Sequence, residues 1–274
     1  MVEMLGFEFM RNAFLAAFLA SLACGLIGPL VVANRQVFLA GGMAHAAYGG
    51  VGLALFLSLP VLPVVWLFTL VMSVFFALIN LKQKEMTEAL VGLIWSGGMA
   101  FGILLLDFSS GYNVDLMSYL FGSILTVSKV DITLMSILNL IIGFIIWVKY
   151  KDFLVLIFDF EYAKSLGLKV NYLYILLVVL ISFVVVLLIQ VVGLILVVAL
   201  LTIPAYLARR WSSNLAMMMF FSFLCALFFS LIGIVLSYYL NLTSGASIIA
   251  VAVICFSFFT LKDLFSGVLR NKKV

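Results

Sequence analysis

Charged residues are scarce in this chain, and their scarcity excludes most classes of protein. Only 9% of the 274 residues are Asp, Glu, Lys or Arg, whereas a typical soluble domain carries about 25%. Hydrophobic residues make up 67% of the chain, more than a soluble fold of this length can bury. The composition therefore indicates a polytopic membrane protein. The net charge of +4 is small, and we expect no nucleic-acid partner.

Side chains that carry catalysis are also few. The chain has one histidine and three cysteines, and Cys24, Cys225 and Cys255 are too scattered for a disulfide framework or a CxxC metal site. No G-x-x-x-x-G-K-[ST], H-E-x-x-H or G-x-S-x-G motif occurs. Acidic residues sit at the edges of apolar runs, which disfavours a proton-coupled transporter. We therefore expect no enzyme active site, and an energy source outside this chain.

Nine apolar runs are candidates for crossing a membrane, which takes about 20 residues per helix. The runs are residues 12–33, 43–59, 61–80, 89–106, 132–148, 172–190, 193–208, 215–240 and 246–261. The run 193–208 is short enough to span only part of the bilayer. Residues 108–131 are expected to form a loop with a short interfacial helix. The predicted fold is an all-α transmembrane bundle of about eight or nine spans.

Basic residues predict the orientation of this bundle. If the loop 81–88 lies inside and nine crossings alternate, 13 of the 15 lysines and arginines fall on the cytoplasmic side. Only Arg11 and Lys129 fall outside. Because positive charge gathers in cytoplasmic loops, we expect the N-terminus outside and the C-terminus in the cytoplasm.

The lone histidine lies in a run of small residues. Gly41, His45, Gly49 and Gly52 share one face of a predicted helix. Two interpretations remain open at this point. Small residues let a second helix approach closely, in which case the imidazole only bonds a neighbour. Alternatively, the glycines line a pathway in which the neutral imidazole of His45 binds a metal ion.

A second candidate site lies in the predicted cytoplasmic segment 149–171. Asp159 is placed to cap a short helix through Glu161 and Ala163, and Gly167 is placed to end it. Such a helix is either an ordinary interfacial helix or an element that docks into a groove of a soluble partner.

Several blocks, in order along residues 13–262, resemble the permease subunits of ABC importers for zinc, manganese or iron. The blocks are Gly28-Pro29, Met43-Ala-His45-Ala, Glu88 to Gly102, Ser118-Tyr119-Leu-Phe-Gly122, Phe158 to Gly167, Val192-Gly193 to Pro204-Ala205, and Ser237 to Gly245. No block is decisive alone, but their order and spacing make the match specific.

The resemblance implies a type II, vitamin B12-importer-like permease fold in one domain, residues 1–274, with a coupling loop at about 150–171. It implies import of a divalent metal ion, with no permanently bound cofactor, by a homodimer of permeases in a prokaryotic cell membrane. The implied partners are a cytoplasmic ABC ATPase, an extracytoplasmic metal-binding protein and membrane lipid. It places His45 in the translocation pathway and Asp159, Glu161, Ala163 and Gly167 at the ATPase.

The chain departs from the family pattern at oxygen ligands. Gly41 replaces the acid one turn before His45, Ala44 replaces a serine, and Asn241 stands where an acid is frequent. Met43 adds a thioether nearby, a ligand that favours softer ions. Two other functions stay open: a permease for a metal chelate such as a siderophore or cobalamin, and a membrane component that works without an ATPase.

Overall fold

The computed structural model describes residues 6–108, 122, 124–194 and 197–271. Every secondary-structure element within these residues is helical. The elements are α2 (Glu8–Ala33), α3 (Val37–Phe56), α4 (Val61–Lys82), η1 (Lys84–Met86), α5 (Thr87–Asp107), η2 (Ile124–Thr126), α7 (Lys129–Phe158), α8 (Phe160–Ser165), α9 (Val170–Val192), α10 (Val197–Ala208), α11 (Leu215–Leu240) and α12 (Ser244–Asn271). The expected interfacial helix and the block beginning at Ser118 fall mainly outside the described residues.

The helix lengths agree with the spans predicted from sequence. Eight of the described helices are long and apolar enough to cross a membrane. The ninth, α10, has 12 residues, which at 1.5 Å per residue is about 18 Å. A helix of that length falls short of the hydrocarbon core, which is about 30 Å thick. The range of eight to nine spans is confirmed, and α10 is the short element.

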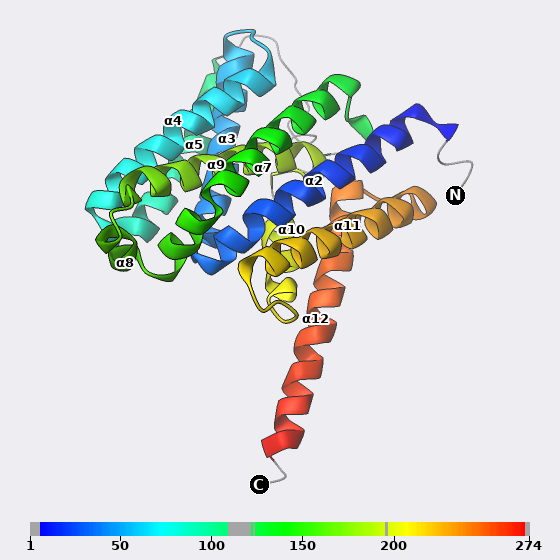
Figure 1. The fold of residues 1–274 in the computed structure, drawn as a ribbon. Coiled ribbons are helices and arrows are strands. Elements are labelled where there is room, and N and C mark those ends of the chain that lie inside the picture. The colour runs from blue at the N-terminus through cyan, green and yellow to red at the C-terminus, as the bar shows by residue number, and fades with distance from the viewer. Residues whose placement is uncertain (1–5, 109–121, 123, 195–196, 272–274) are drawn as a thin grey trace.

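Helix α2 lies at the centre of the bundle, packed against α7, α9, α10 and α11 (Figure 1). Small side chains let these neighbours approach. The fully buried alanines of α2 are Ala13, Ala16, Ala17, Ala20 and Ala23. Since residues three and four apart share a helix face, these alanines form one smooth stripe along α2.

Helix α7 lies at the outside of the bundle. Leu140, Phe144 and Trp147 are 74%, 64% and 78% exposed. Their spacing places them on one face, and an apolar face of this kind is suited to lipid. The helix continues without interruption to Phe158. The segment 149–158, predicted from sequence to belong to a cytoplasmic loop, is therefore the last part of α7.

The two ends of the bundle differ in composition. One end carries the α2–α3 turn, η1, α8 and the α10–α11 connection, where the basic residues predicted to be cytoplasmic cluster. Arg35, in the α2–α3 turn, has a φ of 56°. The opposite end carries the α3–α4 connection, residues 57–60, and η2. A pocket of about 640 Å³ opens there between α3, α4, α7 and α9.

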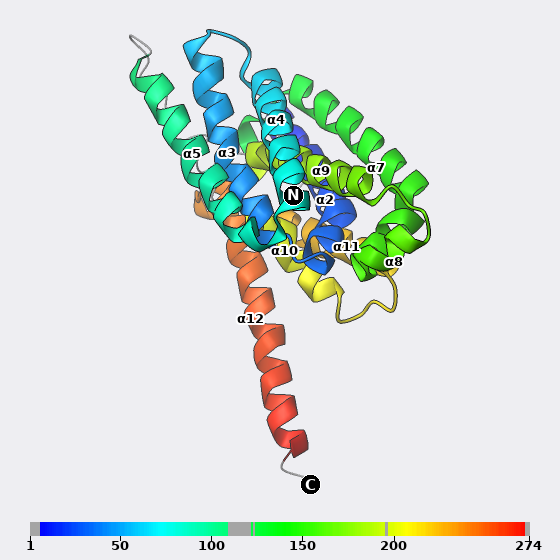
Figure 2. The ribbon, with the colours of Figure 1, turned by 90° about the vertical axis from the view of Figure 1, so that its left-hand side faces the viewer.

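Helix α12 starts against α11 and then projects from the bundle (Figures 1 and 2). The α10–α11 connection holds it where it leaves. Arg210 Nη1 lies 2.6 Å from Asp263 Oδ2 and donates a hydrogen bond of 3.0 Å to the carbonyl oxygen of Phe259. The Trp211 ring meets the Phe259 ring edge to face at 5.3 Å. These contacts set the direction in which α12 leaves the bundle.

Candidate functional site

The imidazole of His45 lies against two side chains of α5. Its ring stacks on the indole of Trp95, with centroids 4.2 Å apart and planes 11° from parallel. Its Nδ1 atom lies 3.2 Å from the sulfur of Met99. Trp95 and Met99 are four residues apart, so they share one face of α5. We refer to His45, Trp95 and Met99 as the His45 cluster.

Close packing of α3 on α5 creates this cluster. A Cβ atom built on Gly49 would lie 2.8 Å from the carbonyl oxygen of Gly98, and one on Gly98 would lie 2.6 Å from the Cα of Ala46. A Cβ on Gly52 would meet the carbonyl oxygen of Gly102. The helices therefore meet backbone to backbone, and Gly49 and Gly52 face α5.

Gly41 has a different environment. A Cβ atom there would lie 3.3 Å from Cγ2 of Val198, on α10, and 3.8 Å from the Trp95 ring. The position thus lies one turn from His45, between α5 and α10. It is tight for a side chain but meets no backbone. Its role as a pathway residue stays a prediction.

The His45 cluster offers nitrogen and sulfur as ligands. His45 is half-buried, although its neighbours on α3 are buried. Among the described residues, no three His, Cys, Asp or Glu side chains come together as a potential metal site. Met43, the thioether noted in the sequence, is fully buried in the core. The sulfur beside His45 belongs instead to Met99, which the sequence alone did not single out.

Helix α8 lies exposed between α7 and α9 at the basic end of the bundle. Asp159 caps it, since its Oδ1 accepts hydrogen bonds from the backbone N–H groups of Glu161 and Tyr162 at 2.9 and 3.0 Å. Ala163 is fully buried and anchors the helix, whereas Glu161 is exposed. Gly167 has a φ of 76°, a conformation that suits glycine at the end of a helix.

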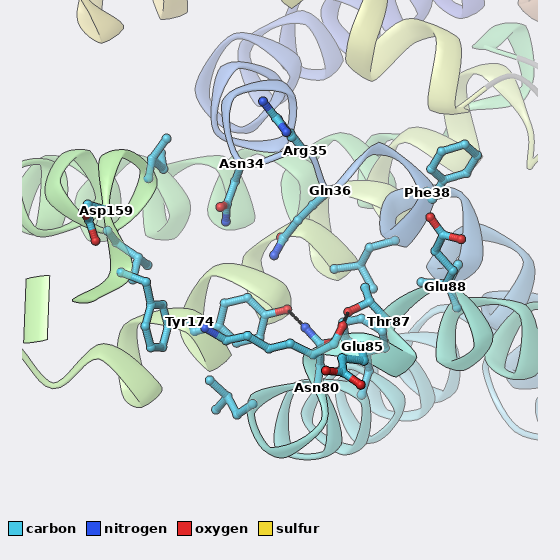
Figure 3. A pocket seen from close by; sticks show the side chains of 18 of the residues that line it. Asn34, Arg35, Gln36, Phe38, Asn80, Glu85, Thr87, Glu88, Asp159 and Tyr174 are labelled. Carbon is cyan, nitrogen blue, oxygen red and sulfur yellow. Dashed lines mark hydrogen bonds between the residues drawn. The ribbon is translucent and has the colours of Figure 1, made fainter. Parts of the chain in front are cut away.

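A pocket of about 550 Å³ lies beside α8, between the α2–α3 turn, η1 and α9 (Figure 3). Asn80 donates from Nδ2 to the hydroxyl of Tyr174 at 2.6 Å and accepts at Oδ1 from the Thr87 hydroxyl at 2.5 Å. The Lys84 ammonium lies 4.0 Å from the centroid of the Phe160 ring. These contacts join α4, α5, α8 and α9 into one unit at this end.

Asn241 lies at the end of α11. It ends α11 in the left-handed conformation, with a φ of 52°. Asparagine adopts this conformation more readily than most residues. Nearby, the hydroxyl of Ser244 accepts a hydrogen bond of 3.3 Å from the backbone N–H of Ile124. These residues lie at the end of the bundle that carries η2.

Comparison with known proteins places the chain among transporter subunits. An uncharacterized membrane protein of Synechocystis, slr2045, is 44% identical over 93% of this chain and 91% of its own length. The manganese transport system membrane protein MntC of Listeria monocytogenes is 28% identical, with 97% and 95% of the two chains covered.

The solved structure of PsaBC from Streptococcus pneumoniae in complex with Fab contains a similar chain. It superposes with a TM-score of 0.82 at 29% identity, over 92% of this chain and 91% of that one. The model of the ABC 3 transport family matches residues 6–262. The chain therefore belongs to the ABC 3 transport family.

Proposed function

We propose that this chain is the membrane permease of an ABC system that imports divalent transition-metal ions of the zinc, manganese and iron class. The observation that carries the proposal is the match in fold and sequence to PsaBC, at a TM-score of 0.82 over nine-tenths of both chains. The name of the Listeria relative, a manganese transport system membrane protein, supports a metal ion as cargo.

The proposed permease is one domain, residues 1–274, whose coupling loop at about 150–171 includes α8. A cytoplasmic ATPase docks on α8. It supplies the energy for transport by hydrolysing ATP, because this chain has no P-loop motif of its own. Glu161 and Tyr162, both exposed, present an acid and an aromatic ring to that partner. An extracytoplasmic metal-binding protein delivers the ion at the outer end. The proposed permease lies in the cell membrane of a prokaryote, and its C-terminus lies in the cytoplasm.

Two copies of the permease are expected to meet at the face that carries His45. Polar side chains within membrane spans turn toward a protein interior or a water-filled cavity because lipid solvates them poorly. The half-buried imidazole lies near the middle of α3. A second copy would enclose it, and the translocation pathway would then run between the two copies past His45.

The ATPase surface is tested by charge reversal. We expect Glu161→Arg to reduce co-purification of the ATPase and metal uptake, because the exposed carboxylate faces the partner. Asp107→Arg is the matched control, since Asp107 is an exposed acid at the opposite end of α5 from η1. If E161R and D107R retain equal amounts of ATPase, α8 is not the docking element.

The pathway is tested at the histidine. We expect His45→Ala to lower metal uptake while the amount of permease in the membrane stays constant, as measured by immunoblot. Unchanged uptake would remove His45 from the pathway. Uptake that persists after deletion of every candidate ATPase gene would instead reject an ABC mechanism.

A chelate permease is the alternative to a free-ion permease. It would require a wide pathway, and the sequence offered Gly41, Gly49 and Gly52 as its lining. Gly49 and Gly52 face the backbone of α5, which leaves only Gly41 for this purpose and favours a bare ion. Competition of uptake by free metal ions against siderophores or cobalamin distinguishes the two cargoes.

A further inference from the structure

The position of the Met99 sulfur bears on which metal ion the pathway favours. This inference rests on the proposed function. Met99 approaches His45 from a different helix, and its sulfur lies 3.2 Å from Nδ1. In the tautomer that carries its proton on Nε2, the Nδ1 lone pair and the sulfur are both available to one ion. A tetrahedral Zn²⁺ bound to both would hold the two atoms about 3.5 Å apart, so little movement is needed.

The ligand chemistry of this pair differs from that of a carboxylate site. Manganese prefers carboxylate, carbonyl and water oxygens, whereas thioether sulfur and imidazole nitrogen suit softer ions such as zinc. At position 41, one turn away, the chain has glycine. Among the described residues, no group of three metal-binding His, Cys, Asp or Glu side chains includes His45. The contact that the described residues make at this place is between an imidazole nitrogen and a thioether sulfur.

Trp95 keeps the pair in position. Its indole stacks on one face of the imidazole at 4.2 Å and thereby limits rotation of the ring about its χ angles. The backbone contact between Gly98 and Ala46 fixes the two helices beside it. The approach of Met99 to His45 is therefore built into the packing of α3 on α5.

We propose that Met99 is a specificity-determining residue that, together with His45, makes the pathway favour Zn²⁺ over Mn²⁺. Each copy of the permease supplies one nitrogen and one sulfur. Two copies supply four ligands, the number that zinc takes in most protein sites. Neutral ligands without carboxylates hold the ion weakly, which suits a site that must release it.

The test replaces the sulfur and retains the volume. Cells that lack the chromosomal gene receive the wild-type chain, Met99→Leu or Met43→Leu, and initial uptake of Zn²⁺ and of Mn²⁺ is measured per permease in the membrane. We expect M99L to lower Zn²⁺ uptake by at least about tenfold, because loss of even an outer-shell partner of a metal ligand costs about 10–100-fold. Mn²⁺ uptake should change little, so the Zn²⁺ to Mn²⁺ ratio falls.

Met43→Leu is the matched control, because Met43 lies on the same helix as His45 but is fully buried in the core. It should leave the ratio unchanged. A ratio that M99L leaves equal to the wild-type ratio overturns the role of Met99 but not the proposed function. If the wild-type chain carries none of Zn²⁺, Mn²⁺ and Fe²⁺, the proposed function itself fails. If M99L reaches the membrane poorly, Met99→Gln replaces it in the test. Glutamine keeps a linear side chain but offers an oxygen ligand, so M99Q should shift the uptake ratio toward Mn²⁺. If it does not, the inference is wrong.

Discussion

A single methyl group added between α3 and α5 should destabilise the permease by a predictable amount. In Gly98→Ala, the new Cβ would lie 2.6 Å from the Cα of Ala46 and 3.2 Å from its Cβ. The nearest atom is backbone, so no side-chain rotation relieves the clash and the helices must separate. Forcing an extra carbon into a packed core costs about 1–3 kcal/mol.

Gly97→Ala provides the matched control. Gly97 is the adjacent residue of the same helix, and a Cβ there meets nothing within 4 Å. Both variants gain the same helix propensity, about 1 kcal/mol from replacing glycine. The difference between the two therefore isolates the clash with α3.

The assay is thermal denaturation of the purified full chain in detergent, followed by the loss of the monodisperse peak in size-exclusion chromatography. At roughly 2–4 °C per kcal/mol, a 2 kcal/mol clash lowers the apparent Tm of G98A by about 4–8 °C relative to G97A. Equal melting temperatures would refute the backbone-to-backbone packing of α3 on α5. The same separation would move Met99 away from His45, so G98A should also lower metal uptake more than G97A.

Three further predictions follow from the site and the orientation. Gly41→Asp places a carboxylate one turn from His45. Because carboxylate oxygen is a ligand that Mn²⁺ prefers, the Zn²⁺ to Mn²⁺ uptake ratio should fall. An unchanged ratio would show that position 41 does not border the pathway. Asp159→Ala removes the acceptor for two N–H groups of α8, a cap worth about 1 kcal/mol, so co-purification of the ATPase should weaken. Asp159→Asn keeps an acceptor oxygen and should retain co-purification. Equal co-purification by the wild type, D159A and D159N would contradict this role of the cap. A reporter fused after Val274 should be active only as a cytoplasmic reporter, and an extracytoplasmic signal would reverse the orientation assigned from the basic residues.

Sequence alone predicted the features that depend on local chemistry. The lengths of the apolar runs gave the spans, and the interval from Asp159 to Gly167 correctly marked the cap and the end of α8. The helix boundaries differ from the ends of the predicted runs. The run predicted at 43–59 is helix α3 over Val37–Phe56: the helix begins six residues earlier, with an apolar turn, and ends three residues earlier.

Features that depend on the register between helices could not be predicted. The sequence places Met43 two residues from His45, which is about 200° around a helix of 3.6 residues per turn, and leaves Met99 far away along the chain. Only the packing of α3 on α5 brings the Met99 sulfur to the imidazole. The end of α7 was also missed. The charged residues after Trp147 are typical of a loop, but no glycine or proline occurs between Phe144 and Phe158 to end the helix.

The uninterrupted course of α7 connects the two ends of the bundle. Its 30 residues form a rod about 45 Å long at 1.5 Å per residue. Near its start, Val130 and Leu134 line the pocket beside η2, and at its other end Ile157 and Phe158 line the pocket beside α8. Because α7 is one continuous helix that lines a pocket at each end, it cannot tilt without changing the shape of both pockets. Under the proposed function, a displacement of α8 by the ATPase would therefore be transmitted along α7 to the opposite end of the bundle. Alternating access requires such a link, because one entrance must open as the other closes.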